Sequence, residues 1–524
     1  MTLPAVKSAL KSADEPAVEP AVQPAQEPAQ DTSFDPASGE RIGAVAHSTA
    51  AEVGHILQRA DRAAPLLAAL RPAIRQAWIA AAADAALAVA DELVILAHAE
   101  TGLGVARLEG ELNRMAASAR FYAGVACEGS YLGVSRDDLD GGSTLVRWNI
   151  PVGVVAVFGA SNFPFGFGIF GHDVASALAA GCPVVVKAHP AHPRLSVRLG
   201  QLVRDALIAA GAPEGTFDVV VGFDAGLQLV DSPVVRAVAF TGSQQAGLAL
   251  VERGARRGIP VFAEMGTVNP VFVTPAAAAH RDSIVQGFVD SFTLGAGQFC
   301  TKPGLILVPA GHGFVASIAQ AVSRVPATPL LTAGIAASFA RGIGELDPQA
   351  TSVSLSVKTE AHAVAGYEVT PRAIAVDLDQ LSPGSRLLEE CFGPVALVAE
   401  YDEPAAALAA LDRLRPSLAA SVFTGREADT DAELAILQLT RRVGRVAVNT
   451  WPTGVVTSWS QQHGGPWPAT SRSEATSVGA GGLARFVRPV SLQNATSAQL
   501  PPMLRPQNPW GLPGRLNGRL VPFE

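Results

Sequence analysis

Short apolar runs alternate with amphipathic stretches over the middle of the chain. Each run is rich in valine or phenylalanine and is bounded by Gly or Pro, which is typical of a buried strand. Each is followed by apolar residues at three- and four-residue spacing, which favours a helix. Repeated strand–helix–strand order implies right-handed crossovers and a parallel sheet. The runs between residues 153 and 266 are GVVAVFG, PVVVKAHP, FDVVVG, VRAVAFTGS and PVFAEMG.

A second series of the same kind begins near residue 269, and a helical stretch precedes the first. Residues 50–126 are rich in Ala and Leu, with an apolar spacing that predicts amphipathic helices. Because the strand–helix series begins again near residue 269, we place a domain boundary near residues 265–270. The pattern therefore predicts an α/β fold with two parallel-sheet domains. The runs of the second series are NPVFVTP, GLILVPA, SVSLSVK and VALVAEYD.

Length and composition agree with this picture. The chain has 524 residues, which suits two or three domains. Hydrophobic residues make up 48% and charged residues 16%, as in a large, well-buried α/β enzyme. A net charge of -8 does not favour binding to nucleic acid or to an anionic membrane. No stretch reaches about 18 uninterrupted apolar residues, so we expect no membrane span.

The N-terminal residues 1–32 repeat E-P-A and Q-P-A units, which neither bury apolar area nor hold a helix. We therefore expect a disordered tail, and it lacks the apolar core and cleavage site of a secretory signal. The four cysteines are far apart and form no C-x-x-C pair, which argues against a disulfide framework or a metal site. They fit a reducing compartment, so we expect a cytoplasmic protein.

Residues 158–173, FGASNFPFGFGIFGHD, contain a literal G-x-G-x-x-G at Gly166, Gly168 and Gly171. Such a motif can hold the pyrophosphate of a dinucleotide, but its first glycine then follows the strand directly. Here residues 160–165 intervene, and no Asp or Glu lies between residues 174 and 204 to bind a ribose. We expect the glycines to allow close helix packing, with a pyrophosphate loop as the alternative.

Three further stretches could carry chemistry. In FTGSQQAG, Gly242 permits a sharp turn and Ser243 stands at a helix N-cap, where free amides attract phosphate. Cys300 lies in the Gly-rich GAGQFCTKPG and is either a small core residue or a thiol open to substrate. Glu264 ends an apolar strand, where ligands bind in open α/β sheets, although a solvated carboxylate is the alternative.

Together these stretches resemble the aldehyde dehydrogenase superfamily over most of the chain after the tail. Each element is short, but eight of them in the correct order are specific. Three departures, ARLEGELNRMA, KAHPAHP and QQHGGPWPATS, resemble the branch that acts on 2,5-dioxovalerate, also called α-ketoglutarate semialdehyde. The relatives of this branch include fatty-aldehyde dehydrogenases that prefer NADP. The eight elements are FDPASGE, FGASNFPF, VVVKAHP, FTGS, AEMGTVNP, GQFCT, EECFGPV and AVNTWPTG.

The resemblance implies a cysteine mechanism. Cys300 would attack the aldehyde carbon to form a thiohemiacetal. The backbone amide of Cys300 and the side chain of Asn162 would donate hydrogen bonds to the oxyanion. After hydride transfer to a nicotinamide, Glu264 would activate the water that hydrolyses the thioester.

The resemblance also implies a site for NADP or NAD. Lys187 would bind the adenosine ribose, and Gly242 and Ser243 would approach the pyrophosphate at a helix N-terminus. Glu390 would hold the nicotinamide ribose, and Phe392 would brace the ring. Glu390 is chosen over Glu389 because the family's glutamate lies two residues before the phenylalanine.

The cofactor preference is expected to depend on Pro190. NAD-preferring members of the family place a glutamate three residues after the lysine, where its charge repels a 2′-phosphate. Here that residue is Pro190, with His189, His192 and Arg194 nearby. We therefore expect NADP to be accepted.

The fold implied by the resemblance has two Rossmann-like domains and a β-strand arm that pairs subunits into a homodimer or homotetramer. The stretch GGSTLVRWNI and the segment after VTSWS are the expected arm strands. The expected parts are a tail at 1–32, a cofactor-binding domain at 33–135 and 151–266, a catalytic domain at 267–450, an arm at 136–150 and 451–490, and an extended segment at 491–524.

The favoured reaction is the oxidation of the small aldehyde 2,5-dioxovalerate to 2-oxoglutarate. A medium- or long-chain fatty aldehyde is the alternative substrate, and a non-catalytic structural protein on the same fold is an alternative of another class. A carboxylate substrate calls for an arginine at the mouth of the site, whereas a fatty chain needs an apolar tunnel. The candidate mouth residues Phe165, Phe299, Trp451 and Trp459 are aromatic and do not decide between the two.

Overall fold

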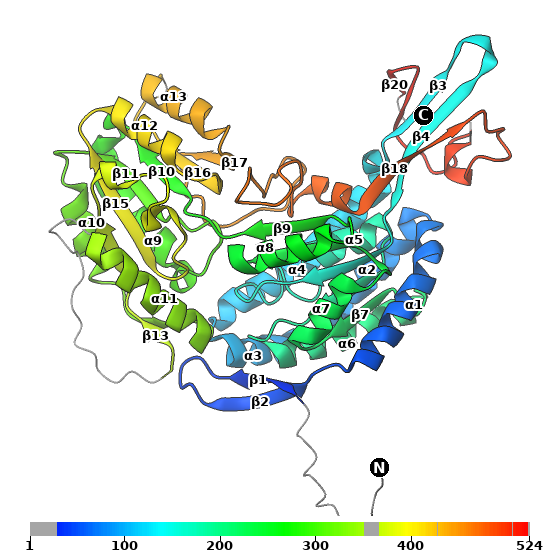
Figure 1. Ribbon diagram of the computed structural model, residues 1–524, viewed down its shortest axis with the longest axis horizontal. Coiled ribbons are helices and arrows are strands. Elements are labelled where there is room, and N and C mark those ends of the chain that lie inside the picture. Colours follow the sequence, from blue (N-terminus) through cyan, green and yellow to red (C-terminus); the bar gives the residue numbers. More distant parts are fainter. Residues whose placement is uncertain (1–28, 350–365, 427, 506, 522–524) are drawn as a thin grey trace, which may run out of the picture.

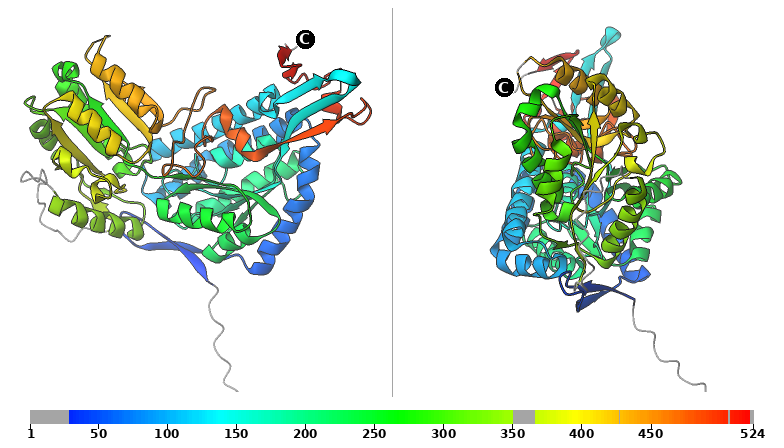
Figure 2. Two further views of the ribbon diagram at one scale, coloured as in Figure 1. Left: turned by 45° about the horizontal axis from the view of Figure 1, so that its top comes forward. Right: turned by 90° about the vertical axis from the view of Figure 1, so that its left-hand side faces the viewer.

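The structure is a computed structural model that describes residues 29–349, 366–426, 428–505 and 507–521. Its elements form two sheet-centred lobes, and a strand arm projects from one of them (Figure 1). The left view of Figure 2 shows the same division, with the arm projecting beyond the lobe that carries it. The expected strand SVSLSVK lies outside the described residues.

The first lobe is built on a five-stranded parallel sheet with the order β7-β6-β5-β8-β9. All five strands expected from the first series of apolar runs are present, and so are the helices between them. The strands are β5 (Val154–Phe158), β6 (Val184–Lys187), β7 (Phe217–Val220), β8 (Val235–Gly242) and β9 (Val261–Met265). The helices are α1 (Ala50–Ala68), α2 (Pro72–Ala88), α3 (Ala90–Thr101), α4 (Val105–Glu128), α5 (His172–Ala180), α6 (Pro193–Ala209), α7 (Phe223–Asp231) and α8 (Gln244–Ala255).

Both faces of this sheet are covered, which explains the nearly continuous apolar runs of its strands. In β5, Val155 and Val157 join one buried cluster with α2 to α6. Val154 and Ala156 join a second cluster with α1, α7 and α8 on the opposite face. Successive side chains of a strand therefore pack alternately into the apolar layers on the two faces of the sheet.

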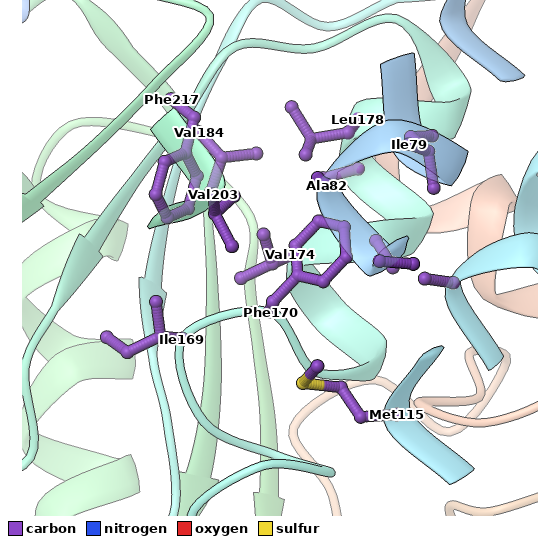
Figure 3. Packing of buried hydrophobic residues seen from close by; sticks show 14 of the residues in the cluster. Ile79, Ala82, Met115, Ile169, Phe170, Val174, Leu178, Val184, Val203 and Phe217 are labelled. Atoms are coloured by element: carbon purple, nitrogen blue, oxygen red, sulfur yellow. The ribbon is translucent and has the colours of Figure 1, made fainter. Parts of the chain in front are cut away.

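The segment after β5 is anchored in the first of these layers. Ile169 and Phe170 point into the cluster formed by α2, α4, α5 and neighbouring strands, where they approach Val174 and Met115 (Figure 3). Both side chains are at most 2% exposed. Burial of two large side chains fixes the end of the segment, so the residues before it are held in place at the edge of the sheet.

Helix starts follow local capping chemistry. Thr49 and Glu52 form a capping box at α1, in which the Glu52 amide donates to Thr49 Oγ1 over 3.2 Å and the Thr49 amide donates to Glu52 Oε2 over 2.7 Å. Ser243 caps α8 by accepting from the Ala246 amide at 3.3 Å, which confirms its expected N-cap position.

The second lobe contains a six-stranded parallel sheet with the order β14-β15-β11-β10-β16-β17. Its strands are β10 (Pro270–Val273), β11 (Leu305–Pro309), β14 (Arg372–Ala375), β15 (Val395–Tyr401), β16 (Ser417–Phe423) and β17 (Val443–Val448). Its helices are α9 (Arg281–Thr293), α10 (Phe314–Val322), α11 (Ala333–Leu346), α12 (Pro404–Arg413) and α13 (Thr430–Leu439). A small antiparallel pair, β12 (Thr328–Pro329) and β13 (Glu368–Val369), lies beside it.

The expected stretch GGSTLVRWNI forms an arm strand, as predicted, and a second one begins at Val487 inside the expected range 451–490, but the rest of the arm differs from the expectation. The arm sheet has the order β18-β4-β3-β19-β20 and consists of β3 (Val134–Asp138), β4 (Thr144–Pro151), β18 (Val487–Gln493), β19 (Gly514–Leu516) and β20 (Arg519–Val521). Residues 451–486, expected in the arm, contribute only an isolated bridge from Thr470 to Glu264. The C-terminal segment instead supplies two arm strands, because its backbone groups extend the sheet beyond β3.

The N-terminal boundary is also corrected. Strand β1 (Gln30–Phe34) begins inside the range 1–32 that was expected as a tail, and it pairs with β2 (Arg41–Ala46). This hairpin packs against α6 and crosses toward the second lobe, where the Tyr367 amide donates to the carbonyl of Pro36 over 2.9 Å. Among the described residues, no helix combines the length and apolar character that a membrane crossing requires.

Candidate active site

The ends of several strands meet a single large cavity between the two lobes. It has a volume of about 1200 Å³ and is bordered by the carboxyl ends of β5, β6, β8 and β9 and by turns of the second lobe. All the site residues proposed from the sequence lie along it. They are Asn162, Lys187, Pro190, Gly242, Ser243, Glu264, Cys300, Glu390 and Phe392.

The glycine-rich segment after β5 has a different purpose from the one expected. A Cβ at Gly168 would overlap the carbonyl oxygen of Pro164, and one at Gly171 would overlap that of Gly166. Gly168 and Gly171 are therefore required by the tight fold of their own segment, whereas a Cβ at Gly166 would meet only Glu111 of α4 at ordinary contact distance. Glu111 of α4 completes the fold by accepting from the amides of Phe165 and Gly166, each at 2.9 Å.

Asn162 is held at the start of this segment. Its side chain is 7% exposed, and Nδ2 donates to the carbonyl of Gln298 over 2.7 Å. Its own carbonyl accepts from Arg107 Nη2 at 2.8 Å. Because an amide nitrogen carries two hydrogens, the second remains for an acceptor in the cavity that Asn162 lines.

Cys300 lies in the turn that follows a short helical segment, Leu294–Gly297. The buried side chain of Asn269 holds this turn by donating to the carbonyls of Cys300, at 2.7 Å, and Lys302, at 3.0 Å. The thiol is half-buried, and its Sγ lies 3.6 Å from Nε2 of His463. Burial and the negative charges of Glu264 and Glu390 raise the pKa of Cys300 well above its ordinary value.

Glu264 stands at the end of β9, 4% exposed. Its Oε2 accepts a hydrogen bond from Ser477 Oγ, and its Oε1 lies 2.9 Å from His463 Nε2. Burial favours the neutral acid, but the charge and hydrogen bonding of His463 and the hydroxyl of Ser477 outweigh it and lower the pKa of Glu264. The carboxylate is therefore ionised beside the thiol.

His463 and Ser477 are functional candidates that the sequence reasoning missed. Both come from residues 451–486, which were assigned to the arm. The His463 amide donates to Thr476 Oγ1 over 2.8 Å, and the Ser477 amide donates to the carbonyl of His463 over 2.9 Å. The signal in the sequence is the histidine of QQHGGPWPATS, a stretch that indicates only the resemblance to the 2,5-dioxovalerate branch.

The ligand atoms of Glu264, Cys300 and His463 all lie within 4.8 Å of one another. A thiolate, an imidazole and a carboxylate at such spacing form a donor set that suits zinc.

The other end of the cavity carries the residues expected at a cofactor. Lys187 ends β6, and burial lowers its pKa. Gly242 and Ser243 form the turn into α8, whose first amides face the cavity edge with the positive end of the helix dipole. Phe223, Leu227 and Leu250 add apolar walls. These features suit an adenosine and a phosphate group.

Glu390 provides the clearest indication that a polar ligand belongs here. Its Oε1 is buried and has no hydrogen-bond partner among the described residues, and burial raises its pKa to about 7. A Cβ at Gly266 would overlap the carboxylate, so only glycine lets Glu390 approach so closely. An unsatisfied buried carboxylate suits the hydroxyl groups of a ribose. The residues present therefore fit a dinucleotide.

Two groups of residues lie elsewhere than expected. Of the basic residues near Pro190, only His189 lines the cavity. His192 contacts Ser196 Oγ at 3.1 Å, and Arg194 donates to the carbonyl of Ile42 over 3.2 Å.

Two of the candidate mouth residues, Phe165 and Trp451, are packed against other side chains. Phe165 is fully buried in the apolar layer beside α4, and Trp451 packs on Phe423 with ring centroids 4.5 Å apart. The aromatic residues that line the cavity near Asn162 are instead Phe163 and Phe167.

Comparison with known proteins gives matches both in sequence and in overall fold. Residues 23–466 match the sequence profile of the aldehyde dehydrogenase family. The chain is 40% identical over 508 residues to alpha-ketoglutaric semialdehyde dehydrogenase 2 of Azospirillum brasilense, covering 93% of this chain and 95% of that one. It is 38% identical over 439 residues to alpha-ketoglutaric semialdehyde dehydrogenase of Acinetobacter baylyi, covering 81% and 83%. Its fold matches the crystal structure of an NAD-dependent aldehyde dehydrogenase from Sinorhizobium meliloti with a TM-score of 0.77, at 24% identity and 89% and 91% coverage.

Proposed function

The chain belongs to the aldehyde dehydrogenase family, and on that premise we propose that it oxidises 2,5-dioxovalerate to 2-oxoglutarate with NADP or NAD as the oxidant. The observation that carries the proposal is the contact of Cys300 Sγ with His463, 3.6 Å away, beside the ionised Glu264. A nucleophile with a base in reach, at the wall of a large cavity, is the arrangement that covalent catalysis requires.

The first step uses the thiol and its neighbour. The raised pKa keeps Cys300 protonated in the free protein, so the thiol proton must leave when sulfur attacks. Glu264, which is ionised and has a carboxylate oxygen within 4.8 Å of Cys300 Sγ, takes this proton and passes it to solvent, while His463 Nε2, 2.9 Å from Oε1, holds the carboxylate in place. The new C–S bond converts the carbonyl into a thiohemiacetal oxyanion. Asn162 Nδ2 and the Cys300 amide donate to that oxygen.

The second step returns the thiol. A bound nicotinamide would supply the hydride acceptor for the thiohemiacetal carbon, and loss of that hydride would leave an acyl thioester on Sγ. Glu264 then takes a proton from water, the hydroxide adds to the thioester carbon, and the C–S bond breaks to give a carboxylate and free Cys300. Ser477 holds the carboxylate of Glu264 in position through its hydrogen bond to Oε2.

The cofactor would be held by this chain's own residues along the same cavity. Lys187 binds the adenosine ribose, and Gly242 and Ser243 bind the pyrophosphate at the start of α8. Glu390 accepts from the nicotinamide ribose, which satisfies its unpartnered oxygen, and Phe392 braces the ring.

We expect NADP to be used as well as NAD. Pro190 replaces the glutamate that repels a 2′-phosphate, and the nearest basic side chains on the cavity wall are Lys187 and His189. A kcat/KM for NAD more than about tenfold above that for NADP would contradict this preference, because that ratio corresponds to about 1.4 kcal/mol of discrimination.

A substrate panel tests the proposed reaction. Initial rates are measured for 2,5-dioxovalerate, succinic semialdehyde, glutaraldehyde and hexanal, each with NAD and with NADP. The proposal predicts the highest kcat/KM for 2,5-dioxovalerate. A higher value for hexanal would favour the fatty-aldehyde alternative, and no turnover of any aldehyde would favour a non-catalytic protein.

We further propose a cytoplasmic homodimer or homotetramer. All four cysteines are free thiols, and a reactive Cys300 needs a reducing compartment. The arm sheet ends at β18 on one side and at β20 on the other, and exposed edge strands of this kind are suited to pairing between subunits.

A further inference from the structure

Arg107, in the first turn of α4, stands out because its guanidinium is partly buried and one of its nitrogens has no partner within the described residues. No salt bridge joins it to a carboxylate anywhere in residues 29–349, 366–426, 428–505 and 507–521. Nη2 donates to the carbonyl of Asn162 over 2.8 Å, but Nη1 is buried and has no hydrogen-bond partner within the same residues. A buried, unsatisfied donor on a charged group is costly, so its retention calls for an explanation.

The surroundings of Arg107 place it beside the reacting groups. The guanidinium carbon lies 5.3 Å from the ring centroid of Phe163 and 4.9 Å from that of Phe299. Phe163 follows Asn162 and lines the cavity, and Phe299 precedes Cys300. The two rings are perpendicular, with centroids 5.0 Å apart. They hold the flat guanidinium by cation–π contact next to Asn162 and Cys300.

The charge of Glu111 reaches Arg107, and its Oε2 is also buried without a partner, but no salt bridge joins the two side chains within the described residues. Glu111, one turn further along α4, directs Oε1 to the amides of Phe165 and Gly166. On the other side, Nη1 faces Gly295, where a Cβ would overlap it. The absence of a side chain at Gly295 thus keeps room for the Nη1 end of Arg107.

A second arginine near the thiol, Arg445, already has hydrogen-bond acceptors. The charge of Arg445, on β17, reaches Cys300, but its Nη2 donates to the carbonyls of Pro452 and Gly454. Arg445 therefore holds the turn after β17, whereas Arg107 keeps a free donor.

From these contacts we propose that Arg107 binds the carboxylate of the aldehyde substrate through its Nη1 edge and so selects aldehydes that carry a distal carboxylate. The inference rests on the proposed function and extends it to a specificity-determining residue. Arginine is suited to this role because its N–H groups match the two oxygens of a carboxylate. It also supplies the donor that an apolar mouth lined only by aromatic rings would lack.

The test compares substrates across variants. Wild type, Arg107→Gln, Arg107→Lys and Arg114→Gln are assayed with 2,5-dioxovalerate, succinic semialdehyde and pentanal, which is neutral and has the same chain length as 2,5-dioxovalerate. Arg114→Gln is the matched control, because it removes a positive charge from an exposed position of the same helix. Turnover of pentanal also reports whether each variant is folded.

We expect Arg107→Gln to lower kcat/KM for 2,5-dioxovalerate by roughly 10- to 100-fold, mainly through KM, since a hydrogen-bonded charge contributes that much binding. Its kcat/KM for pentanal should stay within about threefold of wild type, a split that a merely structural role would not produce. Arg107→Lys should recover part of the loss, and Arg114→Gln should leave both substrates unchanged.

The other outcomes separate this inference from the proposed function. If wild type prefers 2,5-dioxovalerate and Arg107→Gln keeps that preference, or loses both substrates equally, the role of Arg107 is overturned and the function stands. If wild type prefers succinic semialdehyde and Arg107→Gln erases that preference, Arg107 is supported and the proposed substrate fails. If wild type prefers pentanal to both carboxylated aldehydes, both proposals fail.

Discussion

At the scale of single residues, the resting state of Cys300 depends on the charges around it. Burial and the carboxylates of Glu264 and Glu390 raise the pKa of the thiol, so in the free protein it is protonated at neutral pH. This protects the thiol from oxidation, because the thiolate is the reactive form. It also makes the removal of the proton part of catalysis, a task that we assign to the ionised Glu264.

Substitution of Glu264→Gln should therefore make Cys300 more reactive toward an alkylating agent. Removing the negative charge lowers the thiol pKa, which shifts the pH–rate profile of iodoacetamide alkylation to lower pH. The measurement is the rate of alkylation between about pH 6 and pH 10, a range that spans the ordinary thiol pKa. Glu389→Gln is the control, since Glu389 is exposed and faces Arg415 at 3.5 Å. An unchanged profile in Glu264→Gln would show that the carboxylate does not act on the thiol.

Asn162→Ala should reduce kcat by about 100- to 1,000-fold, the usual effect of removing one oxyanion donor. The adjacent Ser161→Ala, on the same cavity wall, serves as the control and should leave kcat within about twofold. Steady-state rates with saturating aldehyde give the comparison. A loss of less than tenfold would remove Asn162 from the oxyanion site.

The sequence was informative at some of these positions and silent at others. Cys300, Glu264 and Asn162 stand in short motifs with a fixed order, so each could be proposed before the fold was known. His463, Ser477 and Arg107 could not, because each becomes notable only through a neighbour distant in the chain. Arg107, for example, contacts Asn162 and Phe299 across separations that no local spacing encodes.

At the scale of elements, the segment between β5 and α5 positions Asn162. Its end is buried through Ile169 and Phe170, and its amides are satisfied by Glu111. The glycines permit the backbone to fold back on itself, as the close approach of Gly168 to Pro164 requires. The literal G-x-G-x-x-G is thus a property of this turn.

Gly168→Ala should destabilise the protein by about 1–3 kcal/mol, since the added Cβ meets backbone that cannot move aside. Gly54→Ala is the contrasting control: it lies in α1 with nothing within 4 Å of the new Cβ and should stabilise the protein by about 0.5–1 kcal/mol. Urea unfolding monitored by circular dichroism measures both. Equal effects of the two substitutions would contradict the assigned role of Gly168.

Elements with a clear period were predictable, and those without one were not. The five strands from β5 to β9 are nearly continuous apolar runs because both faces of their sheet are buried. Residues 451–486 have almost no regular structure, so no period distinguished an arm strand from a segment that crosses the active site. Strand β18 contains Pro489, which weakens its signal and is tolerated at a sheet edge.

At the scale of the whole molecule, the arm predicts assembly. Leu520 on β20 is 73% exposed, an unusual position for a large apolar side chain on a strand that has a partner on only one side. Light scattering coupled to size exclusion should give two or four times the chain mass of 53.9 kDa. Leu520→Glu should shift the mass toward the monomer if the outer hairpin takes part. A wild-type mass of one chain would contradict assembly altogether.

The two lobes and the arm were foreseeable in outline, because two series of strand and helix patterns imply two parallel sheets. Their relative placement was not, since the cavity depends on contacts between lobes that no local pattern contains. The cavity unites Lys187 and Glu390, which are far apart in sequence, and this union is what makes a dinucleotide site plausible in physical terms.

The central claim is that aldehyde oxidation proceeds through an acyl thioester on Cys300, and trapping that thioester tests it most directly. Glu264→Gln, which lacks the base for hydrolysis, is mixed with 2,5-dioxovalerate and NADP, quenched in acid, digested and analysed by mass spectrometry. The account predicts a 2-oxoglutaryl adduct on the peptide that contains Cys300, and none in a Cys300→Ala, Glu264→Gln double variant. An adduct on Cys127, Cys182 or Cys391 alone, or turnover by Cys300→Ala at the wild-type rate, would contradict it.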